Sequence, residues 1–273
     1  MVIFPNCKIN LGLRILRKRS DGFHDLETVF YPIGIKDAIE IIQDSTLTEL
    51  QFSQSGLTVD GNQSDNLCVK AFHLLKKDFP SLPFVKIHLH KNIPMGAGMG
   101  GGSADGAFTL KLLNSIFSLN IAEDKLIDYA LQLGSDCPFF ILNKPCIATS
   151  RGEILNPIHI DLSDYSFLIV NPGLHINTGW AFSQLTPAAA LSIENVISQP
   201  IDSWKNNLIN DFEEPVFIKY PEIKSIKNTL YNNGALYASM TGSGSTVFGI
   251  FKKDYSLPDH LFPQSNYSTN IIK

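Results

Sequence analysis

The first half of the chain contains several short segments in which apolar and polar positions alternate. Residues 84–90 (F-V-K-I-H-L-H) carry apolar side chains at every second position from Val85, which predicts a strand with one buried face. Residues 7–16, 29–33 and 38–42 are also rich in apolar residues. We therefore expect the chain to begin with several strands.

Helical spacing of apolar residues follows in three places. One pattern opens at Asp65-Asn66-Leu67, and another follows Ser103, which we expect to cap its helix. A third helix is expected over residues 121–133, with Gly134 in the position after its last turn, and Pro138 disfavours its continuation. The apolar positions of the second helix are Ala107, Leu110, Leu113 and Phe117.

The second half contains buried-strand patterns at residues 167–170 and 246–251, with helical and strand patterns between them. Polar residues around 149–156 mark a boundary. We expect an α+β protein with two domains, residues 1–152 and residues 153–273. The last twenty residues show only weak patterning.

A glycine-rich segment joins the strand at residues 84–90 to the helix after Ser103. Five of the seven residues in 96–102 are glycine, so the backbone can curl and aim successive N–H groups at an anion. The positive end of the following helix would favour the same anion, which indicates a phosphate-binding loop. A tight turn between two elements is the alternative, but a turn needs one or two glycines.

Comparison with two known phosphate-binding motifs limits the type of phosphate loop that this segment can form. No G-x-x-x-x-G-K-[ST] motif occurs, which excludes the lysine-bearing nucleotide loop. Gly96, Gly98 and Gly101 satisfy G-x-G-x-x-G, which alone is a weak signal. A dinucleotide-binding fold should then place an acidic residue after a second strand, where this chain has the helical pattern of residues 121–133.

Composition limits the partners. The chain has 273 residues, 44% of them hydrophobic, and a net charge of −4, so we expect a globular protein without general affinity for nucleic acid or anionic membranes. No apolar run approaches the roughly 20 residues of a membrane helix, and we expect a cytoplasmic location. Basic residues gather in one place, which is either an anion site or a solvated hairpin: Lys8, Arg14, Arg17, Lys18 and Arg19.

Cysteine and histidine give little sign of a metal site. The four cysteines form no C-x-x-C pair and are expected to be small buried side chains. His88 and His90 share one face of the predicted strand, but a third ligand is missing from the pattern.

Two residues suit proton transfer. Asp136 lies in the segment Gly134-Ser135-Asp136-Cys137-Pro138 among apolar neighbours, where a carboxylate needs a partner, and Lys8 lies in a strand-like run. If paired, the lysine would keep the aspartate ionised and ready to accept a hydroxyl proton. The alternative is that Asp136 only caps a helix that begins near Pro138.

Two further segments each have two possible interpretations. Residues 240–246 (M-T-G-S-G-S-T) are either a bulged entry to the next strand or a second loop that closes over phosphates. Asp21-Gly22-Phe23-His24 is either a hairpin with a core phenylalanine or an aromatic and an imidazole suited to a planar base.

Together these motifs resemble the superfamily of galactokinase, homoserine kinase, mevalonate kinase and phosphomevalonate kinase. Its motif P-x-G-x-G-L-G-S-S-[AS] is similar to residues 94–103 here, and the segments at Asp65 and Gly134 agree. The D-G-[YF]-H-x-L pattern at Asp21 resembles the branch that acts on a cytidine diphosphate derivative of methylerythritol. The likeness runs from residue 4 to about residue 250.

This resemblance implies a fold and a reaction. It implies an N-terminal α/β domain like the second domain of a ribosomal protein and a C-terminal ferredoxin-like domain. The implied enzyme is an ATP- and Mg²⁺-dependent kinase for the 2-hydroxyl of 4-(cytidine 5'-diphospho)-2-C-methyl-D-erythritol, in the non-mevalonate isoprenoid pathway. Its partners would be the small molecules ATP and the cytidine diphosphate acceptor, without nucleic acid or membrane, and the oligomeric state stays open.

The resemblance also assigns residues. Asp136 matches the catalytic base and Lys8 its partner; the rest match binding residues. The acceptor-binding matches are Asn10, Phe23, His24 and Thr178, the phosphate-closing loop is Gly242, Ser243 and Gly244, and Ser103 matches a metal contact. The ATP-binding matches are Asn66, Leu67, Lys91, Pro94, Met95, Gly96, Ala97, Gly98, Met99, Gly100, Gly101, Gly102 and Ser103.

The chain departs from the pattern at three positions. Met99 replaces a leucine, Ala104 replaces a serine, and Phe23 lacks the hydroxyl of the usual tyrosine. Two other functions remain: a dinucleotide-dependent oxidoreductase, which leaves Lys8 and Asp136 without roles, and a catalytically silent nucleotide sensor, which should lack that pair.

Overall fold

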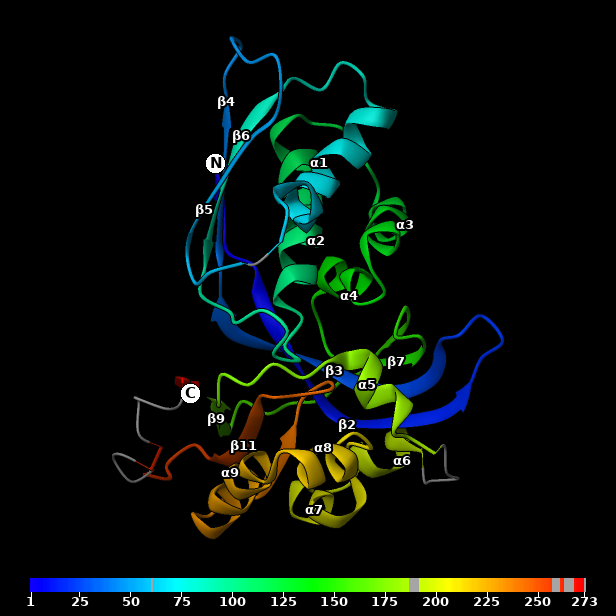
Figure 1. Ribbon diagram of the computed structural model, residues 1–273, viewed down its shortest axis with the longest axis vertical. Coiled ribbons are helices and arrows are strands. Elements are labelled where there is room, and N and C mark those ends of the chain that lie inside the picture. Colours follow the sequence, from blue (N-terminus) through cyan, green and yellow to red (C-terminus); the bar gives the residue numbers. More distant parts are fainter. Residues whose placement is uncertain (60, 187–191, 257–260, 263–267, 273) are drawn as a thin grey trace. The chain divides into compact units, whose positions relative to one another are not determined.

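The computed structural model describes residues 1–59, 61–186, 192–256, 261–262 and 268–272. It divides the chain into two compact units (Figure 1). Unit 1 holds residues 1–8, 34–95 and 100–144, and unit 2 holds residues 9–33, 96–99 and 145–273. Each unit therefore combines segments that are distant in the sequence.

Unit 1 contains a four-stranded sheet in the order β1-β4-β6-β5. Strand β4 (Ala38–Gln43) pairs antiparallel with β6 (Val85–Lys91), and β5 (Gln51–Gly56) pairs parallel with β6. The short strand β1 (Val2–Ile3) pairs with β4 at the edge. Along β6 the side chains of Val85, Ile87 and Leu89 are buried, as the alternation predicts.

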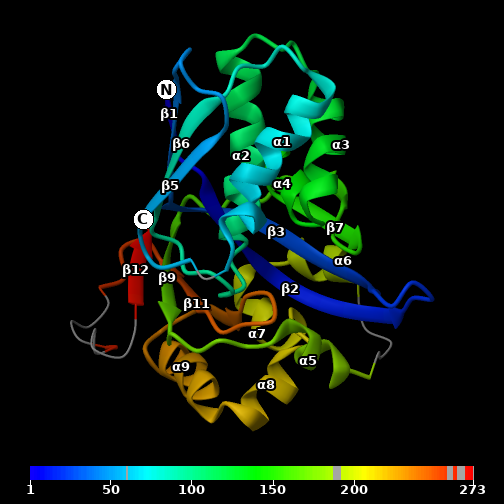
Figure 2. The ribbon, with the colours of Figure 1, turned by 45° about the horizontal axis from the view of Figure 1, so that its top comes forward.

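Four helices of unit 1 lie on one side of this sheet (Figure 2). They are α1 (Leu67–Asp78), α2 (Gly101–Ile116), α3 (Glu123–Leu133) and α4 (Cys137–Leu142). Helix α1 begins where predicted, because the side chain of Asn66 accepts a hydrogen bond from the backbone N–H of Cys68 (2.9 Å). The 3₁₀ turn η1 (Gln63–Asp65) precedes it.

Two antiparallel sheets belong to unit 2. The first has the order β2-β3-β7-β8. Its strands are β2 (Asn6–Lys18), β3 (His24–Lys36), β7 (Cys146–Ser150) and β8 (Ile154–Pro157). Residues 6–8 of β2 and 34–36 of β3 are counted in unit 1. The second has the order β10-β11-β9-β12 and comprises β9 (Tyr165–Asn171), β10 (Tyr237–Met240), β11 (Val247–Lys252) and β12 (Ser268–Ile272).

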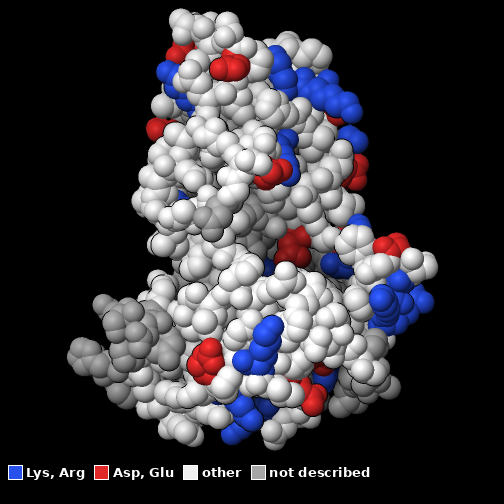
Figure 3. All heavy atoms as spheres, in the orientation of Figure 1, with Lys and Arg blue, Asp and Glu red and all other residues white. Residues whose placement is uncertain are grey.

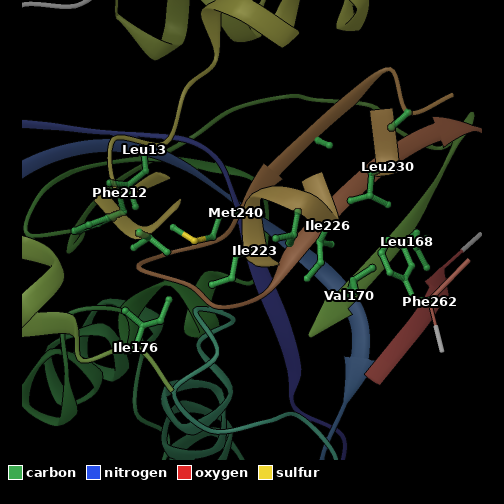
Figure 4. Close-up of a cluster of buried hydrophobic side chains, with 14 of the residues drawn as sticks. Leu13, Leu168, Val170, Ile176, Phe212, Ile223, Ile226, Leu230, Met240 and Phe262 are labelled. Atoms are coloured by element: carbon green, nitrogen blue, oxygen red, sulfur yellow. The ribbon is translucent and has the colours of Figure 1, made fainter. Parts of the chain in front are cut away.

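The longest helix of unit 2, α9 (Pro221–Asn232), packs its apolar side on the second sheet. Its Ile223, Ile226 and Leu230 are buried in the same cluster as Val170 and Met240 (Figure 4). The shorter helical elements are α5 (Thr178–Ser183), α6 (Ile193–Ile197), η2 (Ile201–Ser203), α7 (Trp204–Asn207) and α8 (Glu213–Lys219).

Most predicted elements are confirmed, with two corrections. Ser103 is not a helix cap: α2 already begins at Gly101, because the left-handed backbone of Gly100 (φ 69°) turns the chain into the helix. Gly134 ends α3 as predicted, but its backbone is extended (φ 168°) rather than left-handed. Helix α3 does not continue through Pro138, as predicted. A separate helix, α4, begins at Cys137 and has the proline in its first turn, where a missing N–H costs nothing.

Other expectations have mixed outcomes. All four cysteines are free and buried, as expected. Within the described residues, no helix combines the length and apolar character that crossing a membrane requires. The predicted domain boundary between residues 152 and 153 stays a prediction, since compactness groups separated segments.

Candidate active site

Lys8 and Asp136 lie together in unit 1. Lys8 Nζ is 3.6 Å from Asp136 Oδ2; the lysine side chain is 4% exposed and the aspartate side chain 36%. Asp136 stands at the start of α4, but its side chain makes no capping hydrogen bond. Asp136 is therefore the ion-pair partner of Lys8 and not a helix cap. Its carboxylate stays partly exposed, so that a substrate hydroxyl can reach it.

Burial affects the charge of Lys8. Loss of solvent lowers the pKa of the Lys8 ammonium below its ordinary value, while the negative charge of Asp136 opposes this shift. Deprotonation of the lysine would remove the positive charge beside the carboxylate.

The start of α2 lies against Lys8 and against helix α4, which follows Asp136. A Cβ atom added to Gly100 would lie 3.2 Å from Lys8 Cε and 3.0 Å from Phe140 Cζ, so only glycine fits without displacement. The Ser103 side chain forms a hydrogen bond with Cys137, the first residue of α4, whose thiol pKa burial raises to about 12. Unit 1 thus brings the candidate base, its lysine and the helix start of the predicted phosphate loop into contact.

The predicted phosphate loop uses its glycines as the sequence suggests. Gly96, Gly98 and Gly100 have φ values of 65°, 78° and 69°, a region that other residues rarely adopt. Residues 96–99 belong to unit 2, where a Cβ at Gly98 would lie 2.0 Å from the backbone oxygen of Thr241. The backbone of the first glycine segment (residues 96–102) therefore packs directly on the backbone of the second glycine segment (residues 240–246).

Asn10 organises the second glycine segment within unit 2. Its Oδ1 accepts hydrogen bonds from the N–H of Gly242 (2.9 Å) and from the hydroxyl of Thr241 (3.1 Å). Its Nδ2 donates to the hydroxyl of Thr28 (2.9 Å). Asn10 is 1% exposed, and its side-chain amide connects Thr28, Thr241 and Gly242 through hydrogen bonds. Its contact with substrate stays a prediction.

Ser243, in the second glycine segment, lies near Thr178. The hydroxyls of Thr178 and Ser243 are 3.1 Å apart. Gly242 and Gly244 both have positive φ values, 57° and 96°. A Cβ at Gly242 would lie 2.9 Å from Cα of Gly98, which again reflects the close packing of the two segments. Their role in closing over phosphates stays a prediction.

Phe23 and His24 stand at the β2–β3 hairpin, whose tip carries a gathering of Lys and Arg side chains (Figure 3). The His24 ring stacks on Phe182, with centroids 4.8 Å apart. Burial, and then the charge of Lys18, hold the pKa of His24 below its ordinary value, so the ring is neutral near pH 7 and offers one donor and one acceptor. Phe23 is 52% exposed, and Arg151 Cζ lies 4.9 Å from its ring centroid.

The basic cluster is largely paired. Arg19 forms ion pairs with Asp21 (3.0 Å) and Asp25 (2.8 Å), and Arg17 pairs with Asp25 (2.5 Å). These contacts support the solvated-hairpin interpretation for this part of the cluster.

The residues expected beside adenine lie in unit 1. Asn66 caps α1, and Leu67 packs on α2 close to Gly106. Lys91 is buried, and its ammonium donates to the carboxylates of Asp37 and Asp105. A contact between that ammonium and adenine would require this pairing to be broken.

His88 and His90 share a face, as predicted, and bond to serine hydroxyls. Ser55 Oγ lies 2.9 Å from His88 Nε2 and 3.0 Å from His90 Nδ1. Among the described residues no group of three or more His, Cys, Asp or Glu could hold a metal ion.

Sequence reasoning missed several residues of these clusters. Phe182, Arg151, Asp37 and Asp105 carry no local motif, and their partners are distant in the sequence. Lys91 and Asp37, for example, are separated by 54 positions. The candidate residues divide between the two units, and their assembly into one site stays a prediction.

Two family models match the chain. The GHMP kinases N terminal domain matches residues 66–144, and the GHMP kinases C terminal model matches residues 192–258. The first match spans α1, the glycine segment and α4, which hold the candidate base and the nucleotide-side residues. These matches and the α+β fold define the class, the GHMP kinases, whose members are ATP-dependent phosphotransferases.

Individual relatives narrow this class. A 4-diphosphocytidyl-2-C-methyl-D-erythritol kinase of Azobacteroides pseudotrichonymphae is 51% identical, over 93% of this chain and 95% of its own length. One of Bacteroides thetaiotaomicron is 49% identical, over 100% and 98%. A crystal structure of 4-(cytidine 5'-diphospho)-2C-methyl-D-erythritol kinase superposes with a TM-score of 0.78 at 29% identity, covering 91% of this chain and 89% of that one. The chain belongs to the 4-diphosphocytidyl-2-C-methyl-D-erythritol kinase family.

Proposed function

We propose that this protein transfers the γ-phosphoryl group of ATP to the 2-hydroxyl of 4-(cytidine 5'-diphospho)-2-C-methyl-D-erythritol. The observation that carries the proposal is the Lys8–Asp136 pair in contact with the start of α2, in a chain whose close relatives bear the name of that kinase. An oxidoreductase would leave this pair without a role.

Asp136 is the proposed catalytic base. Its carboxylate would accept the proton of the acceptor hydroxyl as that oxygen attacks phosphorus, so the P–O bond to the acceptor forms while the bond to ADP breaks. Lys8 would hold the carboxylate in place and offset negative charge on the transferring group. The half-exposed position of Asp136 and the burial of Lys8 support this division of roles.

The glycine segment is the proposed phosphate site. Successive glycines with positive φ can direct backbone N–H groups at phosphate oxygens, and the N-terminus of α2 favours negative charge. Asn66 and Leu67 are proposed on the adenine side. Gly242, Ser243 and Gly244 are proposed to close over the phosphates.

Mg²⁺ is the proposed companion of ATP. The Ser103 hydroxyl is a hard oxygen donor, which suits an ion that otherwise takes its ligands from phosphates and water. When bound, the ion supplies positive charge that offsets the charge of the phosphates.

The cytidine end is proposed to bind at the hairpin of unit 2. The neutral His24 ring can hydrogen-bond the edge of a cytosine, and the exposed ring of Phe23 offers a face for stacking. Phe182, stacked on His24, would hold the imidazole in orientation. Thr178 and Asn10 are proposed as further acceptor contacts. Since ATP and nucleotide-linked intermediates occur in the cytoplasm, we propose that location.

A coupled ATP-consumption assay tests the proposal. Purified protein with ATP, Mg²⁺ and the cytidine diphosphate methylerythritol acceptor should produce ADP at a rate that depends on acceptor concentration. A reaction without the acceptor is the control, because it measures the hydrolysis of ATP by water. Consumption equal with and without acceptor would reject the proposal.

A further inference from the structure

Unit 1 buries three ionisable side chains for which the proposed chemistry has no use. Lys91 ends β6, Asp37 precedes β4, and Asp105 lies early in α2. The side chains of Lys91 and Asp37 are 0% exposed and that of Asp105 is 4% exposed. Burying charged groups is unfavourable unless each is well paired, so the pairing within this cluster determines whether it can be tolerated.

The cluster holds the chain that enters the glycine segment. Lys91 Nζ donates to Asp37 Oδ2, and Asp37 Oδ1 accepts hydrogen bonds from the N–H groups of Asn92 (2.6 Å) and Ile93 (2.8 Å). The carboxylate of Asp37 therefore fixes the two peptide groups immediately before Pro94.

The same lysine reaches the helix that follows the segment. Lys91 Nζ donates to Asp105 Oδ2 at 2.8 Å. A Cβ added to Gly101, the first residue of α2, would lie 3.0 Å from Lys91 Nζ and 2.8 Å from Ile93 Cγ2. One side chain thus connects the backbone before the glycine segment to the first turns of the helix after it.

The charges of the cluster balance only when one carboxyl group holds a proton. One ammonium faces two carboxyl groups, and Asp105 Oδ1 is buried without a hydrogen-bond partner in the described part of the chain. Burial raises the pKa of Asp105 to about 8, Lys91 opposes the shift, and Asp37 adds to it. The two carboxylates hold the pKa of Lys91 above its ordinary value although burial lowers it. Burial of Asp105 thus lowers the free energy of unfolding, so a contribution to stability alone does not explain this residue.

We propose that Lys91 is a positioning residue for the nucleotide. Held between Asp37 and Asp105, it fixes the start of α2 relative to Asn92 and Ile93, and so keeps the glycine backbone between them shaped for ATP phosphates. The inference rests on the proposed kinase function and gives Lys91 an indirect role instead of a contact with adenine.

Replacement of Asp105 by alanine separates this role from charge balance. Asp105→Ala removes the connection to α2 but leaves Lys91 and Asp37 as a balanced pair, and alanine is a good helix former. We expect the Kd for ATP, measured by calorimetry without acceptor, to rise about tenfold, the effect of losing one charged hydrogen bond. The KM for the acceptor and the melting temperature should stay close to those of the unchanged protein.

Two further variants complete the test. Asp105→Asn retains a carbonyl oxygen that can accept from Lys91, so its Kd for ATP should lie within about twofold of the original. Asp128→Ala, on the exposed surface of α3 where the side chain is 63% exposed, is the matched control and should change nothing. Lys91→Met should weaken ATP binding at least as much as Asp105→Ala and also lower the melting temperature, because it leaves two buried carboxylates unpaired.

Several results would overturn the proposal. They are an unchanged Kd for ATP in Asp105→Ala, an equal loss of affinity for ATP and acceptor, or an Asp105→Asn variant as weak as Asp105→Ala. The unchanged protein is assayed first for phosphoryl transfer. If it binds ATP but transfers nothing to the acceptor, the proposed function fails while the binding comparison among the variants still decides the role of Lys91.

Discussion

At the scale of single residues, the environment of one carboxylate separates a catalytic from a structural interpretation. A capping aspartate would accept an N–H from the first turn of its own helix, and Asp136 does not. Its partner is instead the buried ammonium of Lys8. A half-exposed carboxylate held by a buried lysine has the arrangement that a base for a hydroxyl proton requires.

Asp136→Asn tests this role. The amide has the same shape but cannot take the proton, so we expect kcat to fall by roughly 10²-fold or more. The Kd for ATP should remain close to that of the unchanged protein. Single-turnover kinetics with calorimetry in parallel measures both quantities, and a variant with most of its activity would show that another group accepts the proton.

The pH dependence of kcat tests Lys8. Burial lowers its pKa, so the ammonium loses its proton at a lower pH than the ordinary lysine value of about 10.4. We expect kcat to fall as pH rises through that lowered pKa, because the neutral amine no longer offsets phosphoryl charge. Lys8→Met should be slow at every pH and lack this alkaline decline. The same decline in Lys8→Met would assign it to another group.

His24→Ala tests the cytidine site. Loss of an edge hydrogen bond should weaken use of the cytidine-bearing acceptor by about 1–3 kcal/mol in kcat/KM. The KM for ATP should not change, since His24 is proposed to contact the acceptor alone. His73→Ala, at an exposed position on α1, is the control. A loss of ATP affinity equal to the loss of acceptor affinity would remove His24 from the acceptor site.

At the scale of elements, local patterns predicted well and distant contacts did not. Alternation located β6, and helical spacing located α1, α2 and α3, because each depends on neighbours within a few positions. The start of α2 was misplaced, since a left-handed glycine can begin a helix without any capping side chain. Strand β12 (S-T-N-I-I) carries no strong pattern and forms because β9 offers it a pairing edge.

Some residues of the candidate site could be predicted from the local sequence, and others could not. The glycine segment, Asp136 and Lys8 could be proposed from residue types and spacing. The partners of Lys91 could not, because Asp37 and Asp105 lie 54 and 14 positions away and only the folded sheet and helix bring them together.

Gly100→Val tests the junction of glycine segment and helix. Valine would impose strain at φ 69° and press on Lys8 and Phe140, so we expect ATP affinity and kcat to fall together. Gly61→Val is the matched control, because Gly61 also has a positive φ (107°) but nothing lies within 4 Å of its added Cβ. Calorimetry giving an unchanged ATP affinity in a folded Gly100→Val protein would exclude this junction from the nucleotide site.

At the scale of the whole molecule, the degree of sequence identity, rather than the length matched, distinguishes the relatives of this chain among the GHMP kinases. Its relatives named 4-diphosphocytidyl-2-C-methyl-D-erythritol kinase match at 49–51% identity, whereas a mevalonate kinase structure from Methanococcus jannaschii shares the fold at 13% identity and a TM-score of 0.71. Mevalonate, homoserine and galactose have no base to stack on Phe23, so we expect them to be poor acceptors.

The most direct measurement is the identity of the product made by the unchanged protein. Mass spectrometry and phosphorus NMR of a reaction with ATP and the cytidine diphosphate methylerythritol acceptor should reveal one added phosphoryl group on the 2-hydroxyl, with the diphosphate intact. Reactions with mevalonate, homoserine or galactose should yield little product. Efficient phosphorylation of one of these three, with none of the cytidine compound, would contradict the proposed function.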